Sequence, residues 1–259
     1  MLWLLVVPVA LLVVWLAAVV ATVDLMVPLR EVKGFKKVLV VFPHADDETV
    51  NCGGTISRFS AAGATSTLLL LTGGERGNPA GVADANLKAV RMGEAERVAG
   101  ILGVSRLIQE DFGDGLVSQR REQIAAYLAQ TIRQIGPDLL LTYDPAGLDG
   151  HPDHVACAEI VAGLKRTLFP NMTLWCVALP QRVVSMLKLA RQLHTQPAID
   201  QRRASPTLRI FIGTGVIPKI RAWYAYTSQR GFIAKGLGKL VPVWFAVSAM
   251  QFEYFAEVH

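Results

Sequence analysis

The chain has 259 residues, of which 52% are hydrophobic and 18% charged, and its mean hydropathy is +0.36. This composition is too apolar for a disordered chain and too charged in the middle for a multi-span transporter, and the length suits one large domain. The net charge of +5 divides into −1 over residues 1–29, −2 over residues 30–179 and +8 over residues 180–259. No nucleic-acid-binding motif accompanies the basic part, so we expect an anionic lipid or phosphate partner and no nucleic acid.

The first predicted element is an uncharged apolar run from Leu2 to Val23. At about 1.5 Å per residue, a helix of this length covers roughly the 30 Å of bilayer hydrocarbon, so residues 1–24 are predicted to be a transmembrane anchor. A cleaved signal peptide is the alternative, but no basic residue precedes the run. Residues 25–36 form a basic juxtamembrane linker. By the positive-inside rule they predict a single-pass membrane protein with its catalytic domain, residues 37–259, on the cytoplasmic side.

Short apolar runs then alternate with segments of helical spacing. The run KVLVVF is typical of a strand buried on both faces, because it lacks polar alternation. Buried strands are predicted at 37–42, 65–72, 105–108, 138–143 and 173–178, and helices at 52–63, 84–103, 119–135 and 152–168. This alternation predicts an α/β fold with a Rossmann-like, mostly parallel sheet flanked by helices, preceded by the transmembrane helix.

The C-terminal part, residues 180–259, is basic and apolar. Within it, residues 241–255 form an apolar stretch that is short for a membrane span. Three interpretations remain open for this stretch: a membrane-facing or lid helix, a second span, or ordinary core that completes the sheet.

Two loops, each directly after a predicted strand, carry the residues that suggest chemistry. The first reads PHADDE and begins at residue 43, and the second ends in GHPDH at residues 150–154. In an open α/β sheet, ligands bind beyond the carboxyl ends of the strands, so both loops can reach one crevice. Imidazole and carboxylate groups are the usual ligands of catalytic zinc, which takes three protein ligands and keeps one position open.

The charge pattern of the first loop supports a metal site. Asp46, Asp47 and Glu48 are consecutive, and their mutual repulsion is costly at the end of an apolar strand unless a cation or a positive dipole compensates it. A helix N-terminus is the alternative source of compensation. In the second loop, His151 and His154 are three residues apart at the start of a predicted helix, so they can point to the same side.

PHADDE followed by GHPDH about 100 residues later resembles the LmbE-like/PIG-L family of zinc-dependent de-N-acetylases, which includes N-acetylglucosaminylphosphatidylinositol deacetylases. The resemblance extends from about Lys37 to the end of the chain. Its further matches are LTGGERGNP at 71–79, RMGEAERVAGILGV at 91–104, DFGDG at 111–115 and YTSQ at 226–229.

The resemblance implies roles for the matched residues. His44, Asp47 and His154 would hold Zn²⁺, and the same ligand types also serve Fe²⁺. Asp46 would be the general base that takes a proton from the attacking water. His151 would be the charged or polarising partner of the tetrahedral intermediate.

Other matched positions would bind substrate or support the ligands. Arg76 lies in the loop that, in family members, contacts the acidic group of the sugar's aglycone. Asp149 stands where some members have a Tyr that polarises the substrate carbonyl, so contact with substrate and orientation of His151 both remain open for it. The supporting residues would be Glu48, Asp144 and Asp153.

The resemblance and the expected anchor together imply a hydrolase that removes an N-acetyl group from an N-acetylglucosaminyl glycolipid, such as GlcNAc-phosphatidylinositol, beside membrane lipid. Two alternatives remain open. One is a deacetylase or amidase of a soluble sugar conjugate, and the other is a non-catalytic, membrane-anchored binding module.

Overall fold

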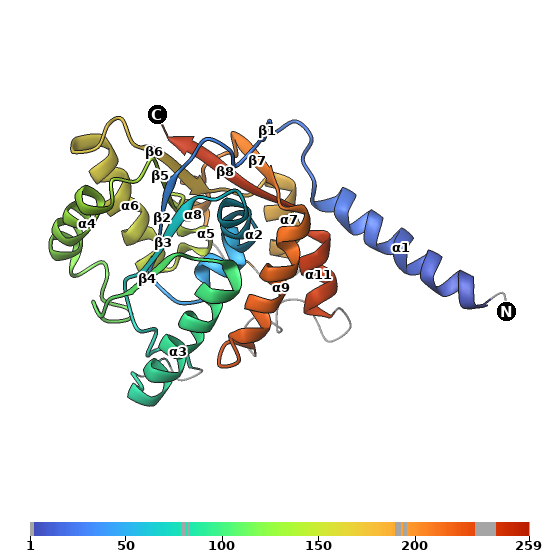
Figure 1. The fold of residues 1–259 in the computed structure, drawn as a ribbon, viewed down its shortest axis with the longest axis horizontal. Helices are drawn as coiled ribbons and strands as arrows, with labels where there is room; N and C mark the ends of the chain where they lie inside the picture. Colours follow the sequence, from blue (N-terminus) through green and yellow to red (C-terminus); the bar gives the residue numbers. More distant parts are fainter. Residues whose placement is uncertain are drawn as a thin grey trace.

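A computed structural model shows one eight-stranded sheet with helices on both faces (Figure 1). The structure describes residues 3–78, 81, 83–189, 193, 196–230 and 242–258. The strands are β1 (Leu29–Arg30), β2 (Lys37–Phe42), β3 (Thr65–Leu70), β4 (Arg106–Gln109), β5 (Leu139–Tyr143), β6 (Thr173–Val177), β7 (Leu208–Phe211) and β8 (Phe252–Val258).

The strands lie in the order β1-β7-β8-β6-β5-β2-β3-β4. From β6 to β4 every neighbouring pair is parallel, whereas β8 runs antiparallel to both β6 and β7. The strand β2 lies between β5 and β3, with Val38 opposite Leu139 and Ser66. The loops that follow β2 and β5 therefore leave the same edge of the sheet from adjacent strands.

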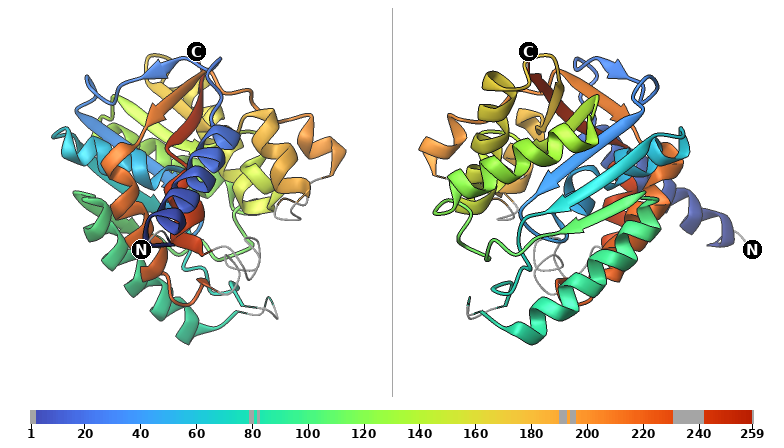
Figure 2. Two further views of the ribbon diagram at one scale, coloured as in Figure 1. Left: turned by 90° about the vertical axis from the view of Figure 1, so that its right-hand side faces the viewer. Right: turned by 60° about the vertical axis from the view of Figure 1, so that its left-hand side comes forward.

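Two apolar cores lie on opposite faces of the sheet, because successive side chains of β2 alternate between them. Val38, Val40 and Phe42 belong to one core, and Leu39 and Val41 belong to the other. The first core is covered by α2, α3 and α9, and the second by α4 and α6 (Figure 2). These helices are α2 (Asp47–Ala61), α3 (Ala85–Leu102), α4 (Arg121–Ile135), α6 (Pro152–Thr167) and α9 (Val216–Ala225).

The remaining helical elements are α1 (Trp3–Thr22), α5 (Gly147–Gly150), α7 (Gln181–Leu189), α8 (Pro197–Asp200), the 3₁₀ turn η1 (Gly213–Gly215) and α11 (Val243–Ala249). The predicted strands and helices between residues 37 and 178 are all found. The largest shift is at α2, which begins at Asp47 and so takes the acids of the PHADDE loop into its first turn.

The α/β fold with flanking helices is confirmed. Five of the seven neighbouring strand pairs are parallel, so the sheet is mostly parallel as predicted, although two antiparallel pairs make it mixed. The cause is β8, whose buried apolar side chains place it between β6 and β7. For residues 242–255, this position and the short helix α11 fit the interpretation as ordinary core. Residue 241 lies outside the described residues.

A correction concerns the membrane. Among the helices of the described residues, none has the length and apolar character needed to cross a membrane. The predicted transmembrane anchor and the single-pass membrane localisation are therefore not supported. The helix α1 instead contacts the C-terminal part of the chain: Trp15 Nε1 donates to Ser248 Oγ at 3.0 Å, and Thr22 Oγ1 donates to the Ala249 carbonyl at 3.3 Å.

Candidate metal centre

Three of the predicted ligands meet where β2 and β5 end. His44 follows β2, Asp47 is the first residue of α2 and His154 lies in the first turn of α6. His44 Nδ1 lies 3.2 Å from His154 Nε2, and the Asp47 carboxylate oxygens lie 3.5 Å from each of these nitrogens. Ligands at about 2.0–2.1 Å from a tetrahedral metal are roughly 3.3–3.4 Å apart, so the triangle has the dimensions of a metal site.

The outer nitrogens of both rings face hydrogen-bond acceptors. His44 Nε2 lies 3.1 Å from Asp114 Oδ1 and 3.3 Å from Asp153 Oδ2. His154 Nδ1 lies 3.0 Å from Asp149 Oδ1 and 3.2 Å from the Gly147 carbonyl. Burial opposes protonation of both rings, but the neighbouring carboxylates outweigh it and raise the pKa values of His44 and His154. If instead each ring is neutral with its proton on the outer nitrogen, the two inner nitrogens present lone pairs to each other across 3.2 Å. A cation between them removes this repulsion, and carboxylates that orient ligating imidazoles in this way are usual around metals.

The carboxylate of Asp47 is prepared for the same role. It accepts hydrogen bonds from the Tyr143 hydroxyl at 2.6 Å and from the His44 backbone N–H at 3.0 Å. Burial raises its pKa, but the imidazoles of His154 and His44 outweigh this effect and hold the pKa of Asp47 well below its usual range. The Tyr143 ring also stacks on His154, with centroids 4.4 Å apart. Asp47 is therefore an ionised, positioned ligand.

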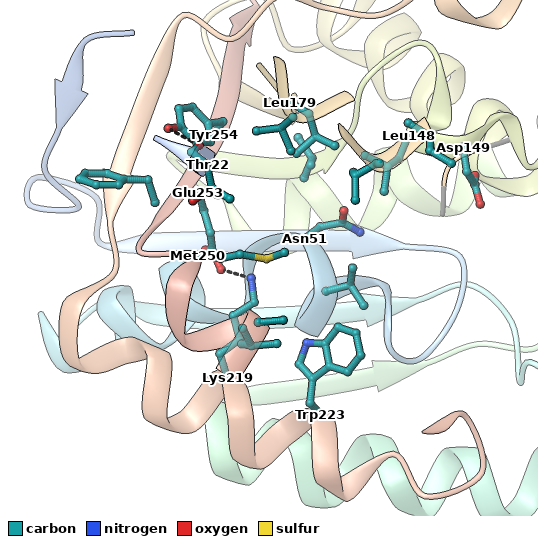
Figure 3. Close-up of a pocket in the computed structure, with 18 residues that line it drawn as sticks. Thr22, Asn51, Leu148, Asp149, Leu179, Lys219, Trp223, Met250, Glu253 and Tyr254 are labelled. Atoms are coloured by element: carbon teal, nitrogen blue, oxygen red, sulfur yellow. Dashed lines mark hydrogen bonds and ion pairs between the residues drawn. The ribbon is translucent and has the colours of Figure 1, made fainter. Parts of the chain in front are cut away.

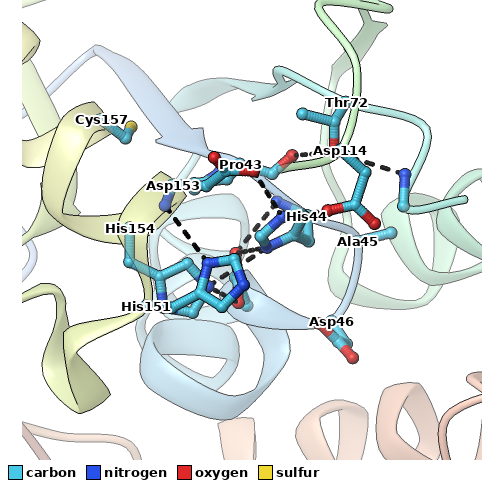
Figure 4. A network of polar contacts seen from close by, with 12 residues as sticks. Pro43, His44, Ala45, Asp46, Thr72, Asp114, His151, Asp153, His154 and Cys157 are labelled. Atoms are coloured by element: carbon cyan, nitrogen blue, oxygen red, sulfur yellow. Dashed lines mark hydrogen bonds and ion pairs between the residues drawn. The ribbon is translucent and has the colours of Figure 1, made fainter. Parts of the chain in front are cut away.

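Asp46 precedes α2 in a strained conformation with φ 106°, a region that non-glycine residues rarely occupy. Two contacts hold it there: its N–H donates to Glu48 Oε2 at 3.1 Å, and its carboxylate lies 3.6 Å from Arg91 Nη2. Burial raises the pKa of Asp46 to about 6, against the opposing effect of Arg91. In Figure 4 its side chain lies apart from the three imidazoles, but Asp46 lines the same cavity as the ligands. A carboxylate of this pKa can accept a proton near neutral pH.

His151 is held with one nitrogen free. Its Nδ1 accepts the Asp153 backbone N–H at 3.3 Å, so the proton lies on Nε2. Burial and the neighbouring imidazoles of His154 and His44 lower the pKa of His151, which favours the neutral ring. In Figure 4 the three imidazoles gather together, and one nitrogen of each lies within 4.8 Å of the others, so the three histidines also form a group that could hold a metal ion. His151 can thus act as a neutral hydrogen-bond donor at the metal centre.

The structure also places the predicted supporting residues. Glu48 is fully buried and accepts from Tyr226 Oη at 2.9 Å as well as from the Asp46 backbone. Asp153 accepts the backbone N–H groups of Gly115 and Val117, at the end of the DFGDG motif and just after it, besides facing His44. Asp144 accepts hydrogen bonds from the backbone N–H groups of Leu148 and Ala204, and from no histidine among the described residues.

The two predicted substrate-binding residues differ in position. Arg76 is exposed and lines the outer part of a cavity of about 540 Å³ that contains the three ligands. Asp149 lines the same cavity but is bound to the ring of His154, and it reaches His151 only through the backbone N–H, at 3.0 Å. Its observed contacts therefore orient His154.

Four residues of the site received no role from the sequence: Tyr143, Arg91, Asp114 and Gln229. Arg91, Asp114 and Gln229 lie in motifs that match the family, so the sequence could have indicated that they belong to the site. Tyr143 is the last residue of a buried strand, and in that position the sequence pattern predicts an ordinary core residue. Asp114 also offers a second ligand set with His44 Nε2 and Asp153, but both carboxylates already accept backbone N–H groups.

Comparisons with known proteins show which family and which proteins the chain is similar to. Residues 39–164 match the family model described as PIG-L, GlcNAc-PI de-N-acetylase. A 1D-myo-inositol 2-acetamido-2-deoxy-alpha-D-glucopyranoside deacetylase of Rhodococcus jostii is 35% identical over 145 residues, covering 46% of this chain and 50% of that protein. Diacetylchitobiose deacetylase of Thermococcus kodakarensis is 39% identical over 121 residues, covering 46% and 45%. The chain thus spans about half the length of the curated relatives it matches.

Solved structures share the fold. N,N'-diacetylchitobiose deacetylase from Pyrococcus horikoshii has a TM-score of 0.60 at 24% identity, covering 92% of this chain and 88% of that chain. A 4-carboxy-2-hydroxymuconate hydratase from Pseudomonas putida has a TM-score of 0.58 at 21% identity, covering 86% and 96%. Since a hydratase shares the fold, the fold alone does not select the reaction.

Proposed function

Because this chain contains a PIG-L/LmbE-like family domain, we propose that it is a metal-dependent hydrolase that removes the N-acetyl group from an N-acetylglucosamine-containing conjugate. The observation that carries the proposal is the triangle of His44, Asp47 and His154, in which the inner nitrogens of the two imidazoles lie 3.2 Å apart and the Asp47 carboxylate oxygens lie 3.5 Å from each of them. The named relatives, which are deacetylases of GlcNAc-containing compounds, support the reaction class.

The donor set fits Zn²⁺, and two imidazoles with one carboxylate also fit Fe²⁺. A metal ion bound there would lower the pKa of water towards about 7 and polarise the amide carbonyl. His44, Asp47 and His154 would hold it. Asp114 and Asp153 would fix the ring of His44, and Asp149 would fix the ring of His154.

The other residues supply proton transfer. Asp46, with its pKa raised to about 6, would accept the proton of the attacking water. His151 Nε2–H would donate to the carbonyl oxygen as negative charge develops on it in the transition state. The Arg91 guanidinium would keep the Asp46 carboxylate in place, and the amine would leave with the proton that Asp46 had accepted.

The relatives are named for an inositol glycoside and a disaccharide. These names favour a sugar conjugate without a lipid, and they give no support to the predicted membrane-lipid partner. GlcNAc-phosphatidylinositol, which gives the matched family its description, is the second candidate substrate. A non-catalytic binding module is disfavoured, since binding alone does not require Asp46, a buried carboxylate beside the ligands with its pKa raised to about 6.

Amine release from a panel of substrates tests this proposal. The panel contains GlcNAc-inositol, N,N'-diacetylchitobiose and GlcNAc-phosphatidylinositol, each assayed with protein loaded with Zn²⁺ or Fe²⁺. We expect amine release from at least one of these substrates, and a loss of about 10²–10⁴-fold in kcat for Asp46→Ala with metal content unchanged.

Glu96→Gln, which changes an exposed acid on α3, is the control and should keep full activity. No amine release from any substrate with either metal would refute the proposal, and loss of metal in Asp46→Ala would reverse the roles of the two aspartates.

A further inference from the structure

A second cavity, of about 280 Å³, lies beside the metal centre and is mainly apolar. Its walls come from the end of α1, from α2, α7, α9 and α11, and from the strands β6 and β8. In Figure 3, Asp149, Leu148 and Asn51 lie towards one end of this cavity, while Thr22 and Tyr254 lie towards the other. The apolar walls include Val177, Val183, Leu187, Val247, Met250 and Phe252.

One end of the apolar cavity adjoins the metal centre. Asp149 lines both cavities, and its carboxylate is 3.0 Å from Nδ1 of the proposed ligand His154. Asn51 lines the apolar cavity and donates to the Asp47 carbonyl at 2.7 Å and to the Tyr143 hydroxyl at 3.2 Å. The apolar cavity therefore adjoins the metal-site cavity at Asp149, whereas Arg76 lies in the wall of the metal-site cavity alone.

The charged side chains in its wall already have partners. Lys219 Nζ lies 2.6 Å from Glu253 Oε1, and Glu253 also accepts the backbone N–H groups of Gly54 and Thr55. An apolar occupant therefore leaves none of these charges unpaired. Burial of its apolar surface makes the binding free energy more favourable in proportion to the length of the chain.

Leu148, which precedes the shared residue Asp149, has a strained backbone conformation. Leu148 has φ 61° and ψ −59°, a conformation that side-chain-bearing residues rarely adopt. In this conformation Leu148 lines the apolar cavity, while the next residue, Asp149, also reaches His154. Such strain persists where the surrounding structure requires it, and here it places an apolar wall directly beside the metal centre.

We propose that this cavity binds the alkyl chain of a substrate N-acyl group longer than acetyl. The inference rests on the proposed function and extends it, from N-acetyl to N-acyl glucosamine conjugates. The acyl chain is attached to the carbonyl carbon and would enter the apolar cavity past Asp149, which lines both cavities, whereas the sugar and its aglycone would occupy the metal-site cavity near Arg76. An apolar cavity of about 150 Å³ holds a benzene ring, so this cavity has room for roughly eight to ten chain carbons.

The reaction itself is unchanged. Water adds to the amide carbonyl, the C–N bond breaks, and the products are the fatty acid and the free amine. For glucosamine conjugates with N-acetyl, N-butanoyl, N-hexanoyl and N-octanoyl groups, we expect kcat/KM to rise about threefold with each added methylene. Binding of N-octanoylglucosamine, measured by calorimetry against N-acetylglucosamine, should be tighter by at least about 30-fold.

Val183→Phe narrows the cavity from α7, away from the metal ligands. We expect it to lower binding of the octanoyl compound by about tenfold or more and to leave the acetyl compound unchanged. Met186→Phe on the exposed side of the same helix is the matched control and should change neither. Leu187→Ala enlarges the cavity and should move the preferred chain length upward, which tests the cavity even if Val183→Phe does not fold.

The outcomes separate this inference from the proposed function. Equal binding of octanoyl and acetyl compounds would overturn the inference even if the acetyl compound is hydrolysed. A larger gain for the octyl glycoside of N-acetylglucosamine, lost in Val183→Phe, would overturn it by assigning the cavity to the aglycone. Tight binding of the octanoyl compound that is sensitive to Val183→Phe, without hydrolysis of any compound, would support the cavity assignment and refute the hydrolase.

Discussion

At the residue scale, the main feature is that each predicted ligand has a partner behind it. Tyr143 serves two ligands at once, because its hydroxyl donates to Asp47 at 2.6 Å and its ring stacks on His154. Asn51 in turn donates to the tyrosine hydroxyl, which directs the tyrosine proton to the carboxylate. Groups that orient ligands in this way typically contribute a factor of about 10–100 to metal affinity.

We therefore predict that Tyr143→Phe weakens Zn²⁺ binding by about 10–100-fold, since Asp47 loses its shortest hydrogen bond while the stacked ring is kept. Competition with a chromogenic chelator measures the change. Tyr127→Phe is the matched control, because it removes a hydroxyl that donates to Glu110, remote from the site. Equal Zn²⁺ affinity of the Tyr143→Phe and Tyr127→Phe proteins would contradict a supporting role for Tyr143.

At the scale of elements, the segment that follows α9 joins the C-terminal part of the chain to the metal centre. Tyr226 donates to Glu48, which holds the backbone of Asp46. The carboxylate of Glu94 on α3 accepts from the Thr227 hydroxyl at 2.5 Å and from the backbone and hydroxyl of Ser228 at 2.9 and 2.6 Å. The site thus depends on residues far outside the segment 39–164 that matches the family model.

Glu94 makes this connection dependent on pH. Burial raises its pKa, but the donors on Ser228 and Thr227 outweigh burial, so the pKa of Glu94 is lowered in the folded protein. A lowered pKa stabilises the fold above the unfolded value of about 4.3, and the stabilisation is lost as the pH falls below that value. We predict that Glu94→Gln lowers the free energy of unfolding at pH 7 by about 1–3 kcal/mol, since hydrogen bonds to a charged group are lost.

Urea unfolding at pH 7 and pH 4 measures this effect, and the difference between wild type and Glu94→Gln should shrink at pH 4. Glu96→Gln, two residues further on the exposed face of α3, should stay within about 0.5 kcal/mol of wild type at both values. The same loss at pH 4 as at pH 7 would show that the ionised form of Glu94 is not what stabilises the segment.

At the scale of the whole molecule, the proposed metal would join elements that are distant in the chain. His44 and Asp47 lie at the end of β2 and His154 lies on α6, and they meet because β2 and β5 are neighbours in the sheet. A metal that binds only the folded protein stabilises it by mass action, by about 2.7 kcal/mol at a hundred times its Kd.

We therefore predict that chelation lowers the Tm and that added Zn²⁺ restores it. His44→Ala should have a Tm that responds to neither treatment, because it removes a ligand. Calorimetric scans at fixed protein concentration test this, with metal content measured in the same samples. A Tm of the wild-type protein that is unaffected by chelation, with metal shown to be removed, would contradict a metal held between these elements.

The sequence by itself determined the local structure and the position of the site. Apolar runs without alternation indicate buried strands, helical spacing indicates the helices between them, and both depend on residues near one another in the chain. The two motifs could be placed together because they follow strands whose carboxyl ends share one edge of the sheet. The ligand, base and polarising roles of His44, Asp46, Asp47, His151 and His154 remain predictions, which the experiments above test.

Only the tertiary structure decided what depends on long-range pairing. Local pattern could not show that residues 252–258 form an antiparallel strand inside the sheet, because the partners that bury it lie about 45 and 80 residues away. In the same way, the sequence could not show that Asp149 contacts the ring of His154 and not that of His151. It also could not show that Tyr143 donates a hydrogen bond to Asp47. The expected membrane anchor was inferred from apolarity alone, and apolarity by itself does not show that a segment spans lipid.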